Sequence, residues 1–172
     1  MSTEQAGGPV RANPRVAWTV DHVGLTVPDA DEAAAFFVCV LGATELYRAS
    51  MPVGTDPEAM ERNLNAHRDA GYRMIKLALG GMALELFDYQ APDLSYVVPR
   101  NCDAGGQHLA LAVPSMSDAL RRLKECDNVR ILGRPSRIAP PHPLAGRRWV
   151  YFVTPWGQHL ELVCDEYRRH RP

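Results

Sequence analysis

Two histidines and two glutamates have the residue types and the spacing to bind one divalent metal ion: His22, Glu85, His108 and Glu161. Each glutamate stands between two leucines in a strand-like segment, and side chains alternate between the faces of a strand. A carboxylate inside a strand costs free energy unless it is paired or binds a cation. Two imidazoles and two carboxylates suit Zn, Fe, Mn, Co or Ni, and leave coordination positions for substrate oxygens. The sequence therefore predicts one divalent metal ion with these four ligands.

An internal repeat relates the four residues in pairs. The segment 21–29 resembles the segment 107–115, since both open with a histidine after one polar residue and end on Val-Pro and a helix-capping residue. The segment 82–87 resembles the segment 158–163, since both contain Leu-Glu-Leu after a turn with glycine. Such self-similarity indicates two copies of one structural unit. The repeat therefore places His22 and His108 at equivalent positions, and Glu85 and Glu161 at equivalent positions.

The elements that must position these residues follow the same repeat. Each half begins with a strand that is followed by an amphipathic helix, expected over 29–41 in the first half and 115–126 in the second. Further strands are expected at 43–48 and 72–79 in the first half, and at 129–137 and 148–154 in the second, before the glutamate-bearing strand of each half. Each half thus reads as strand, helix and three strands. A helical segment within 56–65 interrupts the first half.

The fold class expected from this order is α+β. Two paired βαβββ modules would form one open, cup-shaped mixed β-sheet barrel with the helices outside. We expect a disordered N-terminal segment over 1–15 and a single domain over 16–166, followed by a tail at 167–172. Within the domain, module one covers about 16–90, a linker covers 91–106, and module two covers about 107–166.

The composition excludes several classes of function. The chain has 172 residues, a net charge of −1 and no apolar run long enough to cross a membrane, so neither a nucleic-acid partner nor a membrane is expected. Four cysteines lie far apart without a C-x-x-C pair. They fit free thiols in a reducing cytoplasm, where we expect the protein to act.

The repeated motifs resemble the vicinal-oxygen-chelate superfamily, which includes glyoxalases, epimerases, extradiol dioxygenases and bleomycin resistance proteins. The resemblance rests on His-Val-Gly-Leu-Thr-Val-Pro-Asp, Leu-Glu-Leu-Phe, His-Leu-Ala-Leu-Ala-Val and the stretch from Val150 to Val163, and covers roughly 20–164. It implies the paired modules, a metal ion in the cup, a small-molecule substrate and a homodimer. The glyoxalase and epimerase branches have metal ligands at the positions of His22, Glu85, His108 and Glu161.

The resemblance implies proton transfer with stabilisation of an enediolate, as in a lyase or an isomerase. Glu161 or Glu85 would be the base. An Fe(II) extradiol dioxygenase is the first alternative, because it needs only His22, His108 and Glu161, and because Tyr151 and His142 match the spacing of its further residues. Tyr151 is accordingly a third catalytic candidate. A binding or resistance protein without catalysis is the second alternative, and retention of all four ligands disfavours it.

Overall fold

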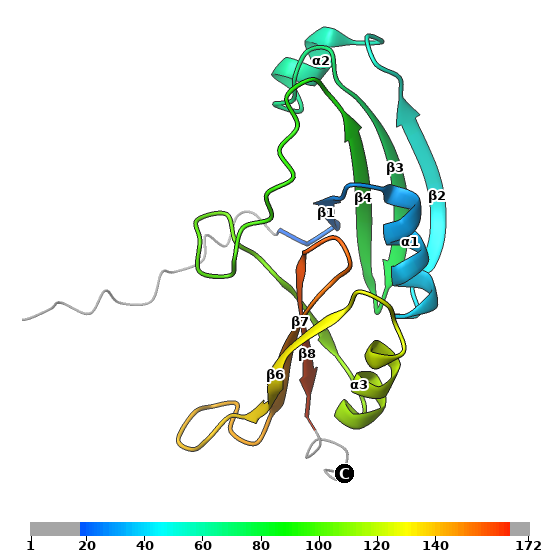
Figure 1. The fold of residues 1–172 in the computed structure, drawn as a ribbon. Helices are drawn as coiled ribbons and strands as arrows, with labels where there is room; N and C mark the ends of the chain where they lie inside the picture. The colour runs from blue at the N-terminus through cyan, green and yellow to red at the C-terminus, as the bar shows by residue number, and fades with distance from the viewer. Residues whose placement is uncertain (1–17, 166–172) are drawn as a thin grey trace, which may run out of the picture.

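The computed structural model describes residues 18–165, so the expectations for 1–15 and for 167–172 lie outside the described residues. The chain forms two modules (Figure 1). The elements of the first are β1 (His22–Thr26), α1 (Ala30–Cys39), β2 (Thr44–Met51), α2 (Pro57–Arg62), β3 (Gly71–Leu79) and β4 (Met82–Gln90). The elements of the second are β5 (Leu109–Ala112), α3 (Met116–Lys124), β6 (Arg130–Arg137), β7 (Arg148–Val153) and β8 (His159–Cys164).

Each module contains one mixed four-stranded sheet. The strand orders are β1-β4-β3-β2 and β5-β8-β7-β6, so the two sheets repeat one topology. In each, the first strand runs parallel to the last, and the other neighbours are antiparallel. The predicted α+β class with two βαβββ modules is confirmed. The two sheets stay separate and leave an open rather than a closed arrangement.

The helices begin and end where local chemistry dictates. The side chain of Asp29 accepts a hydrogen bond from the backbone N–H of Glu32 at the start of α1, and Ser115 does the same for Asp118 at the start of α3. Both satisfy N–H groups that the first helical turn leaves without partners. Gly42 follows α1 with a φ of 78°, a conformation that glycine adopts without steric cost. Asp29 and Ser115, which end the two repeated segments, are therefore the N-caps of α1 and α3.

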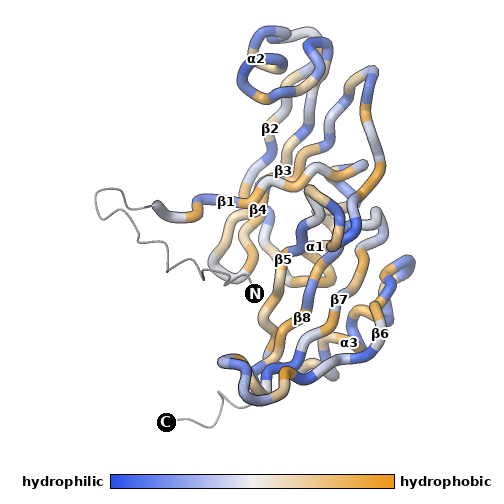
Figure 2. Tube along the Cα trace, turned by 90° about the vertical axis from the view of Figure 1, so that its left-hand side faces the viewer, coloured by the Kyte–Doolittle hydropathy of each residue, from blue (hydrophilic) through white to orange (hydrophobic). Residues whose placement is uncertain are grey.

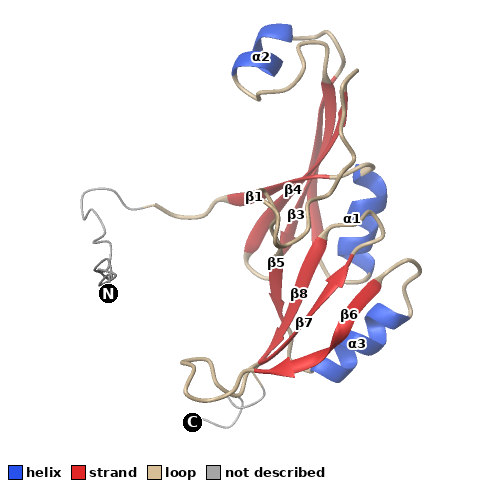
Figure 3. Cartoon of the chain, turned by 60° about the vertical axis from the view of Figure 1, so that its left-hand side comes forward, coloured by secondary structure: helices blue, strands red, loops and turns tan. Residues whose placement is uncertain are grey.

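The leucines beside each glutamate face the helices. Leu84, Leu86, Leu160 and Leu162 are at most 1% exposed. Figure 3 shows α1 and α3 on the same side of the two sheets, so the opposite faces carry the glutamates. Buried residues of both modules belong to one hydrophobic cluster, which holds the two sheets in a fixed relation.

Trp156 connects the two modules. It lies in the turn between β7 and β8, and its ring centroid is 5.5 Å from that of Phe36 and 6.2 Å from that of Phe37, both on α1. The Phe36 contact is edge-to-face, the geometry that aromatic rings prefer. A residue near the second glutamate thereby packs against the helix of the first module.

The interruption of the first module is the short helix α2, at the far end of β2 and β3 (Figure 1). Figure 2 shows mainly hydrophilic residues around it, although Met60 is completely buried. All four cysteines are free thiols, and Cys39 and Cys102 are exposed. Among the described residues, no helix is long and apolar enough to cross a membrane.

Arg73 on β3 ties α1 to the first sheet. Its guanidinium pairs with Asp88 on β4, whose side chain is 10% exposed, and lies 2.7 Å from the Asp31 carboxylate on α1. The ion pair with Asp88 raises the pKa of Arg73. A buried carboxylate that loses its cationic partner keeps the cost of its desolvation.

We expect Arg73→Met to lower the free energy of unfolding by about 1–3 kcal/mol, because Asp88 stays buried without a partner. Urea denaturation at neutral pH measures the change. Arg134→Met, at an exposed position on β6, is the matched control and should change stability by less than about 0.5 kcal/mol. Equal losses in both variants would contradict the role given to the Asp88 ion pair.

Candidate functional site

The first His–Glu pair lies on the open face of the first sheet. His22 begins β1, and the register places Gly24 beside Glu85 on β4. His22 Nε2 is 3.2 Å from Glu85 Oε2, with side-chain exposures of 40% and 12%. His22 Nδ1 is 2.7 Å from Asp21 Oδ2. A carboxylate on one ring nitrogen fixes the orientation of the imidazole and leaves the other nitrogen directed at Glu85.

The second pair repeats this geometry on the other sheet. His108 directly precedes β5, and its Nε2 atom is 3.3 Å from Glu161 Oε2 on β8. The Tyr151 hydroxyl is 3.4 Å from the same His108 nitrogen, and the two rings meet edge to face. Burial, and then the charge of Glu161, raises the pKa of Tyr151. Tyr151 thus stays protonated well above neutral pH beside the second pair.

The structure brings the four predicted ligands together as two pairs. Between residues 18 and 165, no group of three or more His, Cys, Asp or Glu side chains is arranged to hold a metal ion. Neither glutamate points into the helix layer, because each alternates with its buried leucine neighbours. Each sheet therefore presents one imidazole and one carboxylate, which is half of the predicted ligand set.

Lys76 is a site residue that the sequence reasoning missed. It is the cross-strand partner of Glu85, and its Nζ atom is 3.0 Å from Glu85 Oε1. Its side chain is 17% exposed, and the ion pair with Glu85 raises its pKa. The sequence carried a signal: Lys76 and Glu85 stand equally far from the Gly80–Gly81 turn, as facing residues of a hairpin do.

Aromatic side chains flank both pairs. Phe87 and Tyr89 stack with ring centroids 5.7 Å apart, and Tyr72 contacts both. By strand alternation, Phe87 and Tyr89 share the face of Glu85. On the second sheet, Trp149 lies 5.6 Å from Tyr151 between ring centroids. Both open faces thus combine a His–Glu pair with an apolar wall.

Two further histidines occupy different surroundings. His159 shares the face of Glu161, and its Nδ1 atom is buried without a hydrogen-bond partner within the described residues. His142 is exposed on the β6–β7 loop, where its ring accepts a hydrogen bond from the backbone N–H of Leu144. His159 thus lies in the site region, whereas the ring of His142 is hydrogen-bonded within its own loop.

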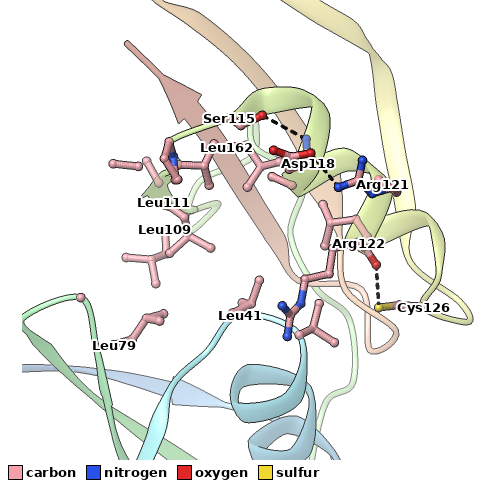
Figure 4. A pocket seen from close by; sticks show the side chains of 18 of the residues that line it. Leu41, Leu79, Leu109, Leu111, Ser115, Asp118, Arg121, Arg122, Cys126 and Leu162 are labelled. Atoms are coloured by element: carbon pink, nitrogen blue, oxygen red, sulfur yellow. Dashed lines mark hydrogen bonds and ion pairs between the residues drawn. The ribbon is translucent and has the colours of Figure 1, made fainter. Parts of the chain in front are cut away.

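A large cavity lies apart from both His–Glu pairs. It has a volume of about 920 Å³ and an apolar lining from α3, the end of α1 and neighbouring strands, including Leu41, Leu79 and Leu109 (Figure 4). None of the four predicted metal ligands lines this cavity, so it is not the candidate metal site. A second cavity of about 310 Å³ includes Gly24, Thr26, Tyr89 and Gln107. It adjoins both histidines along the chain and has the size of a small-molecule pocket.

The amino-acid sequence is similar to that of a known protein family and of a characterised relative. The model of the Glyoxalase/Bleomycin resistance protein/Dioxygenase superfamily matches residues 19–162. A 2-epi-5-epi-valiolone epimerase from Actinomyces sp is 45% identical over 148 residues, which are 86% of this chain and 79% of the relative. This similarity supports an enzyme of the isomerase type.

Solved structures share the fold at low identity. A glyoxalase family protein from Bacillus cereus has a TM-score of 0.71 and 17% identity, covering 89% of this chain and 98% of its own. The fosfomycin resistance protein FosX from Listeria monocytogenes, in complex with Mn(II) and sulfate, has a TM-score of 0.56 and 15% identity, covering 89% of this chain and 97% of its own. That relative binds a divalent metal ion within the same fold.

Proposed function

Since the chain belongs to the Glyoxalase/Bleomycin resistance protein/Dioxygenase superfamily, we propose that it is a divalent-metal-dependent epimerase of a small hydroxylated ketone. The observation that carries the proposal is the matched occurrence of two His–Glu pairs, with N–O distances of 3.2 and 3.3 Å. The epimerase relative supports the reaction type and suggests a cyclic ketone like 2-epi-5-epi-valiolone as substrate.

The donor atoms fit a divalent metal ion of the Zn, Fe, Mn, Co or Ni type. His22 and Glu85 would hold it from one sheet, and His108 and Glu161 from another, giving two nitrogen and two oxygen donors. A bound cation would stabilise negative charge that develops on a carbonyl oxygen of the substrate.

A homodimer would complete the ligand set. In one chain the two pairs do not form a group that can hold a metal ion. A twofold axis places the first pair of one protomer against the second pair of its partner, and creates two equivalent sites at once. The helices leave the glutamate-bearing faces of both sheets open to such a partner (Figure 3).

The residues of the chain would then carry out the proton transfer. A glutamate would take the proton from the carbon beside the carbonyl, and protonation of that carbon from its opposite face, by a second acid in exchange with solvent, would invert the stereocentre. The protonated Tyr151 hydroxyl, beside His108, offers a hydrogen bond to a substrate oxygen. The wall of Phe87 and Tyr89 packs against the carbon ring and excludes water from the reacting face.

An extradiol dioxygenase remains the second candidate, because Tyr151, which matches the spacing of a residue in that branch, lies beside His108. His142, the other residue of that pattern, contacts its own loop. The epimerase relative and the fourth donor, Glu85, favour proton transfer over this alternative.

Incubation with 2-epi-5-epi-valiolone in D2O tests the proposal. We expect the Mn(II)-loaded protein to invert one stereocentre and to introduce one deuterium at that carbon, as observed by NMR, because the abstracted proton exchanges with solvent. Chelation of the metal should abolish the exchange. Oxygen consumption with a ring-opened product would overturn epimerisation in favour of the dioxygenase, and binding of the ketone without any turnover would favour a binding protein.

A further inference from the structure

The two glutamates of the proposed site differ in what lies across the strand from them. The register of the first sheet pairs Glu85 with Lys76, and that of the second pairs Glu161 with Tyr151. Lys76 and Tyr151 therefore occupy equivalent positions of the repeat. One glutamate faces an ammonium group, whereas the other faces a phenol, so the two halves of the site are chemically unequal.

The two oxygens of Glu85 have separate partners. Oε1 is 3.0 Å from Lys76 Nζ, and Oε2 is 3.2 Å from His22 Nε2. Oε2 is therefore close to the His22 nitrogen with which it would bind a cation, while Oε1 is paired with the ammonium group of Lys76. A charge-assisted hydrogen bond of this kind is about twice as strong as a neutral one.

Lys76 is itself held in place. Its ammonium group lies 3.9 Å from Asp21 Oδ2 and 5.8 Å from the centroid of the Tyr47 ring. With 17% of its side chain exposed, it cannot swing freely into solvent. Since Asp21 also orients His22, both donors of the first half are fixed by an outer layer of charged groups.

The second half lacks this arrangement. The Tyr151 hydroxyl is hydrogen-bonded to His108, and the Glu161 carboxylate is paired with His108 and, among the described residues, with no lysine or arginine. Glu161 is therefore free to rotate away when a substrate oxygen arrives, whereas Glu85 is anchored.

We propose that Lys76 is a positioning residue, whose ammonium group holds Glu85 Oε1 and so keeps Glu85 as a fixed, one-oxygen ligand. The inference rests on the proposed function, since it concerns a ligand of the proposed metal ion. It assigns unequal roles to the two glutamates: Glu85 anchors the metal ion, and Glu161 is left to move the proton.

Mn(II) binding to the substrate-free protein tests the role of Lys76. We expect Lys76→Met to weaken Mn(II) binding about 10–100-fold, the usual effect of losing an outer partner of a metal ligand. The Co(II)-loaded variant should also show a changed visible spectrum, because Glu85 can then bind through both oxygens. Lys76→Arg keeps a cationic donor and should recover most of the affinity.

Whether Lys76→Met weakens or tightens Mn(II) binding distinguishes a positioning role of Lys76 from simple charge compensation. A cation near a metal site repels the metal ion, so if Lys76 only balanced charge, its removal would tighten Mn(II) binding. Tighter or unchanged binding by Lys76→Met, with an unchanged Co(II) spectrum, would overturn the inference. Lys124→Met is the matched control, because Lys124 on α3 is exposed and is the other lysine of the chain.

Failure of the proposed function gives a different result. If the wild-type protein binds no Mn(II), the metal-dependent function fails, and with it the role of Lys76. If the wild type binds Mn(II) and both Lys76 variants bind it equally well, the inference about Lys76 alone fails. Circular dichroism of Lys76→Met checks the fold, and Lys76→Gln, which also lacks the ammonium charge, supplies the same comparison if Lys76→Met does not fold.

Discussion

Glu161→Gln should lower kcat by about 10²–10⁴-fold, the contribution of a general base. The amide has nearly the shape of the carboxylate but cannot accept the substrate proton at neutral pH. Glu161 is the expected base because its carboxylate is paired with His108, 3.3 Å away, whereas one oxygen of Glu85 is held by the ammonium group of Lys76. Stopped assays of epimerisation and of deuterium uptake in D2O measure the loss.

Glu85→Gln is the matched control for this prediction. It removes the same charge at the equivalent position of the repeat, and its main effect should be weaker metal binding, so excess Mn(II) should restore much of its rate. Glu161→Gln should stay slow at any Mn(II) concentration. If instead Glu161→Gln keeps its deuterium exchange and Glu85→Gln loses it when saturated with metal, the base is Glu85 and the assignment is wrong.

Two inactive double variants should restore each other when they share a dimer. The first variant, His22→Ala with Glu85→Gln, lacks the first pair, and the second, His108→Ala with Glu161→Gln, lacks the other. In a twofold dimer with sites between chains, the heterodimer contains one site with all four ligands and one with none. We expect its activity to rise from near zero to about half that of the wild-type dimer.

Coexpression of the two variants with different affinity tags isolates the heterodimer. Metal analysis should find about one ion per heterodimer and two per wild-type dimer, since one of the two symmetry-related sites is lost. A heterodimer as inactive and metal-free as its parents would mean that each chain builds its own site. A chain that stays monomeric at assay concentrations and is still active would reject the shared site altogether.

The sequence alone determined the elements and the faces of the strands. Alternation around Glu85 and Glu161 separated carboxylate from leucine, and the structure places all four leucine neighbours at 1% exposure or less. The caps Asp29 and Ser115 fixed the helix starts. These features depend on residues close together in the chain, and the same pattern occurs in both copies of the repeat. For the same reason, the repeat equated His22 with His108 and Glu85 with Glu161, and the two His–Glu pairs of the structure have matching N–O distances.

Only the tertiary structure decided how the two halves sit relative to each other. The sequence suggested four ligands in one cup, whereas in one chain the two pairs form no common group in the described part. That relation depends on contacts between distant segments, such as Trp156 against Phe36, which no local pattern encodes. Lys76 was missed for a related reason: its role comes from register across a hairpin, which places its ammonium group 3.0 Å from Glu85. Sequence periodicity fixes which face a side chain takes, but the packing between elements fixes what it meets there.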